Sequence, residues 1–192
     1  MNDQELDLIK TINMGTIKLN RLLLKTAFSC MACDGDIDKR EVKLIRDLHN
    51  QHKTFGEVDI DQELDKLTSA INEQGQQFLK NYFTELVSLE LSEADELRLI
   101  EVAIQTIKAD EKVEYSEVKF FKVIRSKLKI KDAPILEKHP DFEEYLEQDI
   151  ISASYMAKLQ DDIFSTQSLP KFDLISKIDK DLLDNLDKQG EG

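Results

Sequence analysis

The sequence has few of the residues that interrupt helices and few of the patterns that form strands. Its 192 residues include three prolines and six glycines, and alternating runs of β-branched residues are rare. Leucine, isoleucine, lysine, glutamate and aspartate are abundant and recur at helical spacing. We therefore expect an all-α protein, a helical bundle without strands.

An excess of positive charge and long apolar runs are also missing. The chain carries 39 acidic and 26 basic residues, a net charge of −13, which is the wrong sign for neutralising nucleic acid phosphates or anionic lipid. No run approaches the roughly 18 apolar residues that a membrane span needs. Residues 1–7 carry acids where a secretory signal has a basic start. We expect a cytoplasmic protein with no nucleic acid partner and no membrane insertion.

The motifs of common catalytic sites do not occur either. The sequence lacks the serine nucleophile elbow, the zinc-protease motif, the P-loop, the Rossmann glycine pattern and the Glu-x-x-His pairs of di-iron bundles. An enzyme would then require residues far apart in the sequence to converge in a pocket. We expect a non-enzymatic protein.

An internal repeat becomes visible when the sequence is aligned with itself at a shift of 76 residues. Residues 25–45 then align without gaps with residues 101–121. The matched pairs are Ala27 with Ala103, Asp34 with Asp110, Ile37 with Val113, Asp38 with Glu114, and Glu41-Val42-Lys43 with Glu117-Val118-Lys119. Each copy, at about 20–50 and 96–130, predicts a helix, an acidic turn and a second helix.

The apolar residues of these helices recur at helical spacing, so we expect two hairpins that each have one apolar face and pack on each other. Two more helices are predicted between the copies, at about 61–71 and 76–91, with Ser92 as the N-cap of the next helix. These elements predict one domain over residues 1–131.

Residues 132–192 predict a C-terminal helical extension. Helices should break at three proline-containing segments, because the residue before proline avoids the helical region: Asp132-Ala-Pro134, Lys138-His-Pro140 and Ser168-Leu-Pro170. Short helices are expected near 141–164. A final amphipathic helix is expected near 172–186, with docking on the core favoured over waiting for a partner.

The first acidic turn offers four carboxylates within eight residues: Asp34, Asp36, Asp38 and Glu41. A calcium-binding EF-hand is excluded, because two of its ligand positions fall on Cys30 and Ala32. The remaining oxygen ligands suit Ca²⁺ or Mg²⁺. The alternative is capping, since Asp38 followed three residues later by Glu41 has the spacing of a capping box.

The paired segments Ala32–Val42 and Lys108–Val118 resemble the signature of the TerB-like (tellurite-resistance) family. The resemblance covers about residues 20–130. It implies an all-helical fold, a link to tellurite resistance and stress response, and divalent-metal binding by the acidic turns. It singles out Asp34, Asp38 and Glu41 in the first copy and Asp110, Glu114 and Glu117 in the second. In the second copy, Glu111 replaces the turn glycine and Lys112 replaces an acid.

Two further motifs do not fit their surroundings. Cys30 and Cys33 have zinc or redox spacing, but His49 lies far along a helix that leads away from them, and the cysteine pair closes a helix instead of opening one. His139-Pro-Asp141 matches the tripeptide of J-domain co-chaperones but lacks the basic helix that should run into it.

Two hypotheses follow. The first is a non-enzymatic TerB-like module that binds a divalent cation, a basic protein surface or both. Its predicted metal ligands are Asp34, Asp36, Asp38, Glu41, Asp110, Glu114 and Glu117. The second is a structural scaffold in which the acids are helix caps and the C-terminal helix recruits a protein partner.

Overall fold

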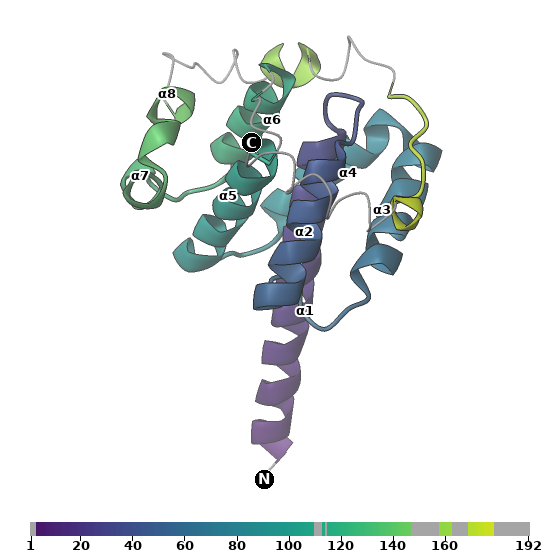
Figure 1. Ribbon diagram of the computed structural model, residues 1–192. Helices are drawn as coiled ribbons and strands as arrows, with labels where there is room; N and C mark the ends of the chain where they lie inside the picture. Colours follow the sequence, from purple (N-terminus) through teal and green to yellow (C-terminus); the bar gives the residue numbers. More distant parts are fainter. Residues whose placement is uncertain (1–2, 110–112, 114, 147–157, 163–168, 179–192) are drawn as a thin grey trace.

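The computed structural model describes residues 3–109, 113, 115–146, 158–162 and 169–178, with side chains from Met14 onward. Within these residues every regular element is a helix, which confirms the all-α prediction (Figure 1). The elements are α1 Asp3–Ala32, α2 Lys39–His52, α3 Ile60–Gln74, α4 Gln76–Ser88, α5 Glu93–Ile107, α6 Tyr115–Lys127, α7 Asp132–Lys138, η1 Pro140–Phe142, α8 Glu143–Leu146 and η2 Ile175–Lys177.

The C-terminal half of α1 forms the centre of the bundle. From Leu22 to Cys33 every residue except Lys25 is buried. Helices α3, α4, α5 and α6 all pack on α1, while its N-terminal half extends beyond the other helices (Figure 1). A helix that is apolar on all sides must be surrounded. The prediction of a single apolar face was therefore too narrow for this helix.

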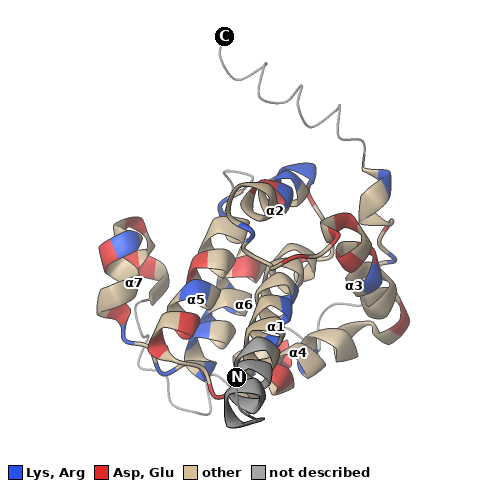
Figure 2. Ribbon diagram, turned by 90° about the horizontal axis from the view of Figure 1, so that it is seen from below, with Lys and Arg blue, Asp and Glu red and all other residues tan. Residues whose placement is uncertain are grey.

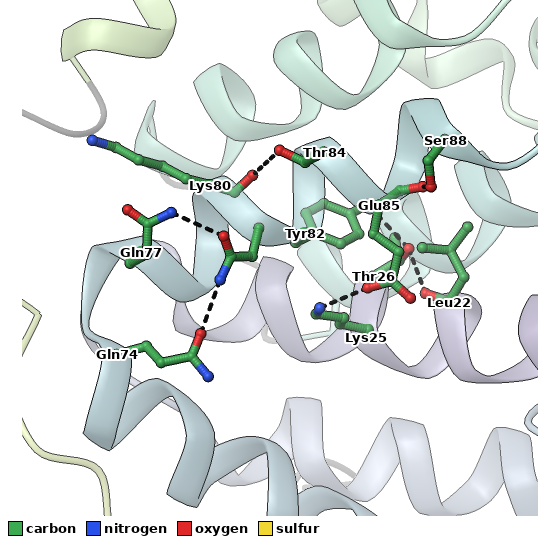
Figure 3. A network of polar contacts seen from close by, with 11 residues as sticks. Leu22, Lys25, Thr26, Gln74, Gln77, Lys80, Tyr82, Thr84, Glu85 and Ser88 are labelled. Atoms are coloured by element: carbon green, nitrogen blue, oxygen red, sulfur yellow. Dashed lines mark hydrogen bonds and ion pairs between the residues drawn. The ribbon is translucent and has the colours of Figure 1, made fainter.

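Polar groups inside the bundle hold α4 on α1. The hydroxyl of Tyr82, which is fully buried, donates to Thr26 Oγ1 over 3.0 Å, and Thr26 Oγ1 donates to the carbonyl of Leu22 over 2.8 Å (Figure 3). Burial raises the pKa of the Tyr82 phenol well above its usual range. At the rim, Lys25 Nζ lies 2.7 Å from Glu85 Oε2. These contacts fix the rotation of α4 about its own axis.

The helix boundaries in the middle of the chain follow the predictions. The two expected helices are present as α3 and α4, separated at Gly75. Ser92 is the N-cap of α5, because its Oγ accepts from the Asp95 N–H over 3.2 Å. The Asp95 carboxylate accepts from the Ser92 N–H in return, which completes a capping box.

One buried acid had no signal in the sequence. Glu96 on α5 is 6% exposed, and its Oε2 accepts from the N–H groups of Lys129 and Ile130 over 2.8 and 2.6 Å. The carboxylate therefore satisfies two backbone donors of the segment between α6 and α7.

The predicted break at Pro134 is wrong, because Pro134 lies in the first turn of α7. The first N–H groups of a helix have no partner within the helix, so a proline there loses no hydrogen bond. The break at Lys138-His-Pro140 is confirmed: α7 ends at Lys138 and Pro140 begins η1. Helical residues 143–146 and 158–162 fall within the range predicted for short helices.

Residues 169–178, which we call the C-terminal strap, differ from the prediction. Residues 169–174 have no regular structure and 175–177 form one 3₁₀ turn, so the helix predicted near 172–186 is wrong as far as Ile178. The rest of that predicted helix, and the start of the Ser168 break, lie outside the described residues. The described part of this segment does pack on the core, because Ile175 is 1% exposed and η2 packs on α3.

None of the helices in the described part of the chain has both the length and the apolar character that crossing a bilayer requires.

Candidate functional site

The first acidic turn, residues 33–38, joins α1 to α2. Gly35 has a φ of +95°, and its N–H donates to the carbonyl of Ala32 over 3.3 Å. The Asp34 carboxylate accepts from the Asp36 N–H over 2.9 Å, and the Asp36 carboxylate accepts from the Ile37 N–H over 3.0 Å. Two of the four predicted ligands, Asp34 and Asp36, therefore stabilise the turn by accepting from its own backbone N–H groups.

The other two predicted ligands begin α2. The Asp38 carboxylate accepts from the Arg40 N–H over 2.7 Å, and Glu41 Oε2 accepts from the Asp38 N–H over 2.9 Å. With the bond from the Glu41 N–H to Asp38, this is a complete capping box. Glu41 is 5% exposed. The capping alternative thus describes the geometry of both residues.

Arg40 neutralises part of the charge of the turn. Its Nε and Nη2 each lie 3.0 Å from an oxygen of Asp38. The bond from the Arg40 side chain holds the pKa of the Asp38 carboxyl below its usual value, against an opposing effect of burial. The ribbon of α2 in Figure 2 is coloured for basic as well as acidic residues. The exposed acid of the turn is Asp36.

In the second copy the structure places one of the three predicted ligands. Glu117 lies in the first turn of α6 and is 5% exposed, the same value as Glu41. Asp110 and Glu114 lie outside the described residues.

Two cysteine thiols lie where the two copies meet. Cys30 and Cys33 are 1% and 4% exposed. Burial raises the pKa of both thiols well above the usual value, and the charges of Glu117 and Glu41 raise it further. The pKa values of both thiols are therefore raised by one carboxylate from each copy of the repeat. Raised pKa values keep the sulfurs protonated, which disfavours nucleophilic chemistry.

The C-terminal strap covers one side of the acidic turn. A Cβ added at Gly35 would lie 3.3 Å from Pro170 Cδ. Gly35 is therefore suited to this position both by its positive φ and by the close approach of the proline. The sequence contained no signal that residues 135 positions apart would touch here.

The fit of a divalent cation to the turn is incomplete in the described residues. Among them, no three His, Cys, Asp or Glu side chains are placed to hold one metal ion. Asp34, Asp36, Asp38 and Glu41 each accept a backbone N–H instead. A bound Ca²⁺ or Mg²⁺ would require these oxygens to turn toward a common point.

No family model matches the sequence, and no match was found among curated proteins or among solved structures. The TerB-like resemblance therefore stays a prediction from the sequence.

Replacing Asp38 separates capping from charge. Asp38→Ala should lower the free energy of unfolding by about 1 kcal/mol, because the N–H groups at the start of α2 lose their acceptor. Asp38→Asn should cost only a few tenths of a kcal/mol at pH 7, since asparagine caps helices as well as aspartate. Urea unfolding followed by circular dichroism measures both.

The difference between wild type and Asp38→Asn should also depend on pH. The folded-state pKa of Asp38 is lowered, so the charged form stabilises the fold above the unfolded-state pKa. This contribution is lost as the pH falls through the lowered folded-state pKa.

For the comparison at pH 7, equal losses of unfolding free energy for Asp38→Ala and Asp38→Asn would contradict the capping role.

Proposed function

We propose that this protein is a non-enzymatic, TerB-like helical module whose acidic turn docks on a basic segment of a protein partner. The observation that carries the proposal is the internal bonding of the turn. Asp34, Asp36 and Asp38 are held by backbone N–H groups, so their carboxylates are ordered before any partner arrives. A preordered surface loses less conformational entropy on binding.

The charge of the chain supports the same partner chemistry. A net charge of −13 attracts basic segments and raises the rate of their encounter with the protein. Arg40 is paired with Asp38. Asp36 is the exposed acid of the turn, so the turn presents the Asp36 carboxylate to a cationic group.

The burial of matched positions supports the TerB-like part of the proposal. At the 76-residue shift, Ala27 and Ala103 are both 0% exposed, and Glu41 and Glu117 are both 5% exposed. Small buried residues at equivalent positions allow close helix packing in both copies. If the resemblance to the TerB-like family holds, the module belongs to a stress-response system linked with tellurite resistance.

A divalent cation at the turn is the second candidate. It is favoured by the exposure of Asp36 and by the local nature of its contact, since that carboxylate is bonded to the next residue of the same turn. Reorienting Asp34 and Asp36 toward an ion would leave the capping box of α2 in place.

A labelled basic peptide tests the docking proposal. A fifteen-residue peptide of alternating lysine and alanine should bind wild type saturably, and the Asp34→Asn/Asp36→Asn variant should bind about three- to tenfold more weakly, because two nearby charges are removed. Fluorescence anisotropy at low and moderate salt measures this, and the affinity should fall as salt rises.

The matched control for this test is Glu143→Gln/Glu144→Gln, which removes the same charge from two exposed residues of α8. Equal weakening by both variants would show that net charge alone attracts the peptide. No saturable binding to wild type would leave the scaffold alternative.

Calorimetric titration tests the cation. Chelator-stripped protein is titrated with Ca²⁺, Mg²⁺, Mn²⁺ and Zn²⁺, and the Asp34→Asn/Asp110→Asn variant should lose saturable binding, because each acidic turn then lacks a carboxylate ligand. The α8 double variant should keep it. Absence of binding to wild type at millimolar ion would exclude the turns as cation sites.

A further inference from the structure

The C-terminal strap lies against a surface formed by α2 and α3. We call this surface the α2–α3 groove and define it by the residues that bond the strap or fix one that does: Arg46, Asp61, Asp65 and Asn72. Figure 1 shows the strap beside α3. The strap itself has no helical ladder before its single 3₁₀ turn. Its backbone groups are therefore available to residues of the groove.

Asn72 of α3 binds both backbone groups of one strap residue. Its Nδ2 donates to the carbonyl of Phe172 over 2.8 Å, and its Oδ1 accepts from the Phe172 N–H over 2.8 Å. A side-chain amide that pairs with one residue's N–H and C=O recognises extended backbone without regard to the side chain.

Two further contacts follow the same principle. Arg46 Nη2 donates to the carbonyl of Ile175 over 3.2 Å, while its Nε is fixed by Asp61 over 2.7 Å. Asp65 Oδ1 accepts from the Ser176 N–H over 3.0 Å. The groove thus satisfies four main-chain groups of the strap: two through Asn72 and one through Asp65, both on α3, and one through Arg46 of α2.

Side-chain preference comes from five strap positions, of which Leu169 is partly buried against the core. Ile175 is 1% exposed, Phe172 is partly buried against the core, and Pro170 packs at Gly35. The Nζ of Lys171 also donates to the carbonyl of Asn72. The groove therefore selects an extended segment with the pattern Leu-Pro-Lys-Phe-x-x-Ile.

Charge favours a segment of this kind. Residues 169–178 carry two lysines and one aspartate within a chain of net charge −13, and the carboxylate of Asp65 bonds directly to the strap at Ser176. A segment held by a few discrete contacts, without a hydrogen-bond ladder of its own, opens at lower free energy than the bundle.

We propose that the α2–α3 groove is a peptide-binding site for a partner protein's extended segment of the pattern Leu-Pro-Lys-Phe-x-x-Ile, and that the strap occupies it in the absence of that partner. This surface is distinct from the acidic-turn docking proposed above, although both adjoin Gly35.

The strap competes with a partner as a tethered ligand. Its effective concentration is on the order of 1 mM. A free peptide that binds the open groove with a Kd of about 100 µM would then bind the closed protein about tenfold more weakly. Binding is therefore measured most directly on a full-length chain whose own strap cannot occupy the groove.

The experiment uses a fluorescein-labelled peptide with the sequence of residues 168–178 and the full-length Ile175→Asp variant. A carboxylate cannot enter the apolar site of Ile175 without a large cost, so the variant leaves the groove open. Circular dichroism and urea unfolding verify the fold. If Ile175→Asp does not fold, Ile175→Ala is used in its place, because alanine perturbs the core less.

By fluorescence anisotropy, the peptide should bind Ile175→Asp saturably and about tenfold more tightly than wild type. Adding Asn72→Ala to the Ile175→Asp chain should weaken binding about tenfold, because both backbone bonds to Phe172 are lost. Adding Asn81→Ala, an exposed asparagine of α4 that bonds only to side chains in the described contacts, is the matched control and should change nothing.

Absence of saturable binding to a folded open variant, or equal binding with and without Asn72, would overturn the proposal. Light scattering on wild type distinguishes a second occupant. A dimer that Ile175→Asp converts to monomer would assign the groove to the strap of a second copy and would also overturn the partner-peptide assignment.

Discussion

The structure depends on the burial of one helix on all its sides. Between Leu22 and Ala32, α1 exposes only Lys25 to any extent, so four other helices must surround it. The polar groups in this stretch are bonded within the core, as Thr26 is to Leu22 and Tyr82. Because α1 ends directly at the acidic turn, this burial also fixes where the turn lies.

The sequence predicted what local chemistry decides and missed what distant contacts decide. Ser92 and Asp38 were recognisable as caps because a cap and its partner lie within three residues. The strap was mistaken for a helix because Ile175 and Ile178 have helical spacing, whereas its conformation depends on Asn72, about 100 residues earlier. Of the predicted ligands, Asp38 and Glu41 lie in a capping box, and the ion itself stays a prediction.

The acidic turn and the α2–α3 groove form two adjoining surfaces on one side of the bundle. Pro170 of the strap contacts Gly35 of the turn, and Arg46 connects α2, α3 and the strap. A partner with a basic segment next to the strap pattern could engage both surfaces at once, and linked binding of this kind increases affinity without new contacts. The acidic-turn proposal rests on a turn held at the buried end of α1, and the groove proposal rests on a strap that opens separately from the bundle.

Hydrogen exchange measured residue by residue tests this division most directly. The account predicts that the amide of Phe28 in α1 exchanges only through global unfolding, while the amides of Phe172 and Ser176 exchange at least about 100-fold faster through local opening of the strap. Equal protection of all three amides would show that strap and bundle open together, and would contradict a removable strap.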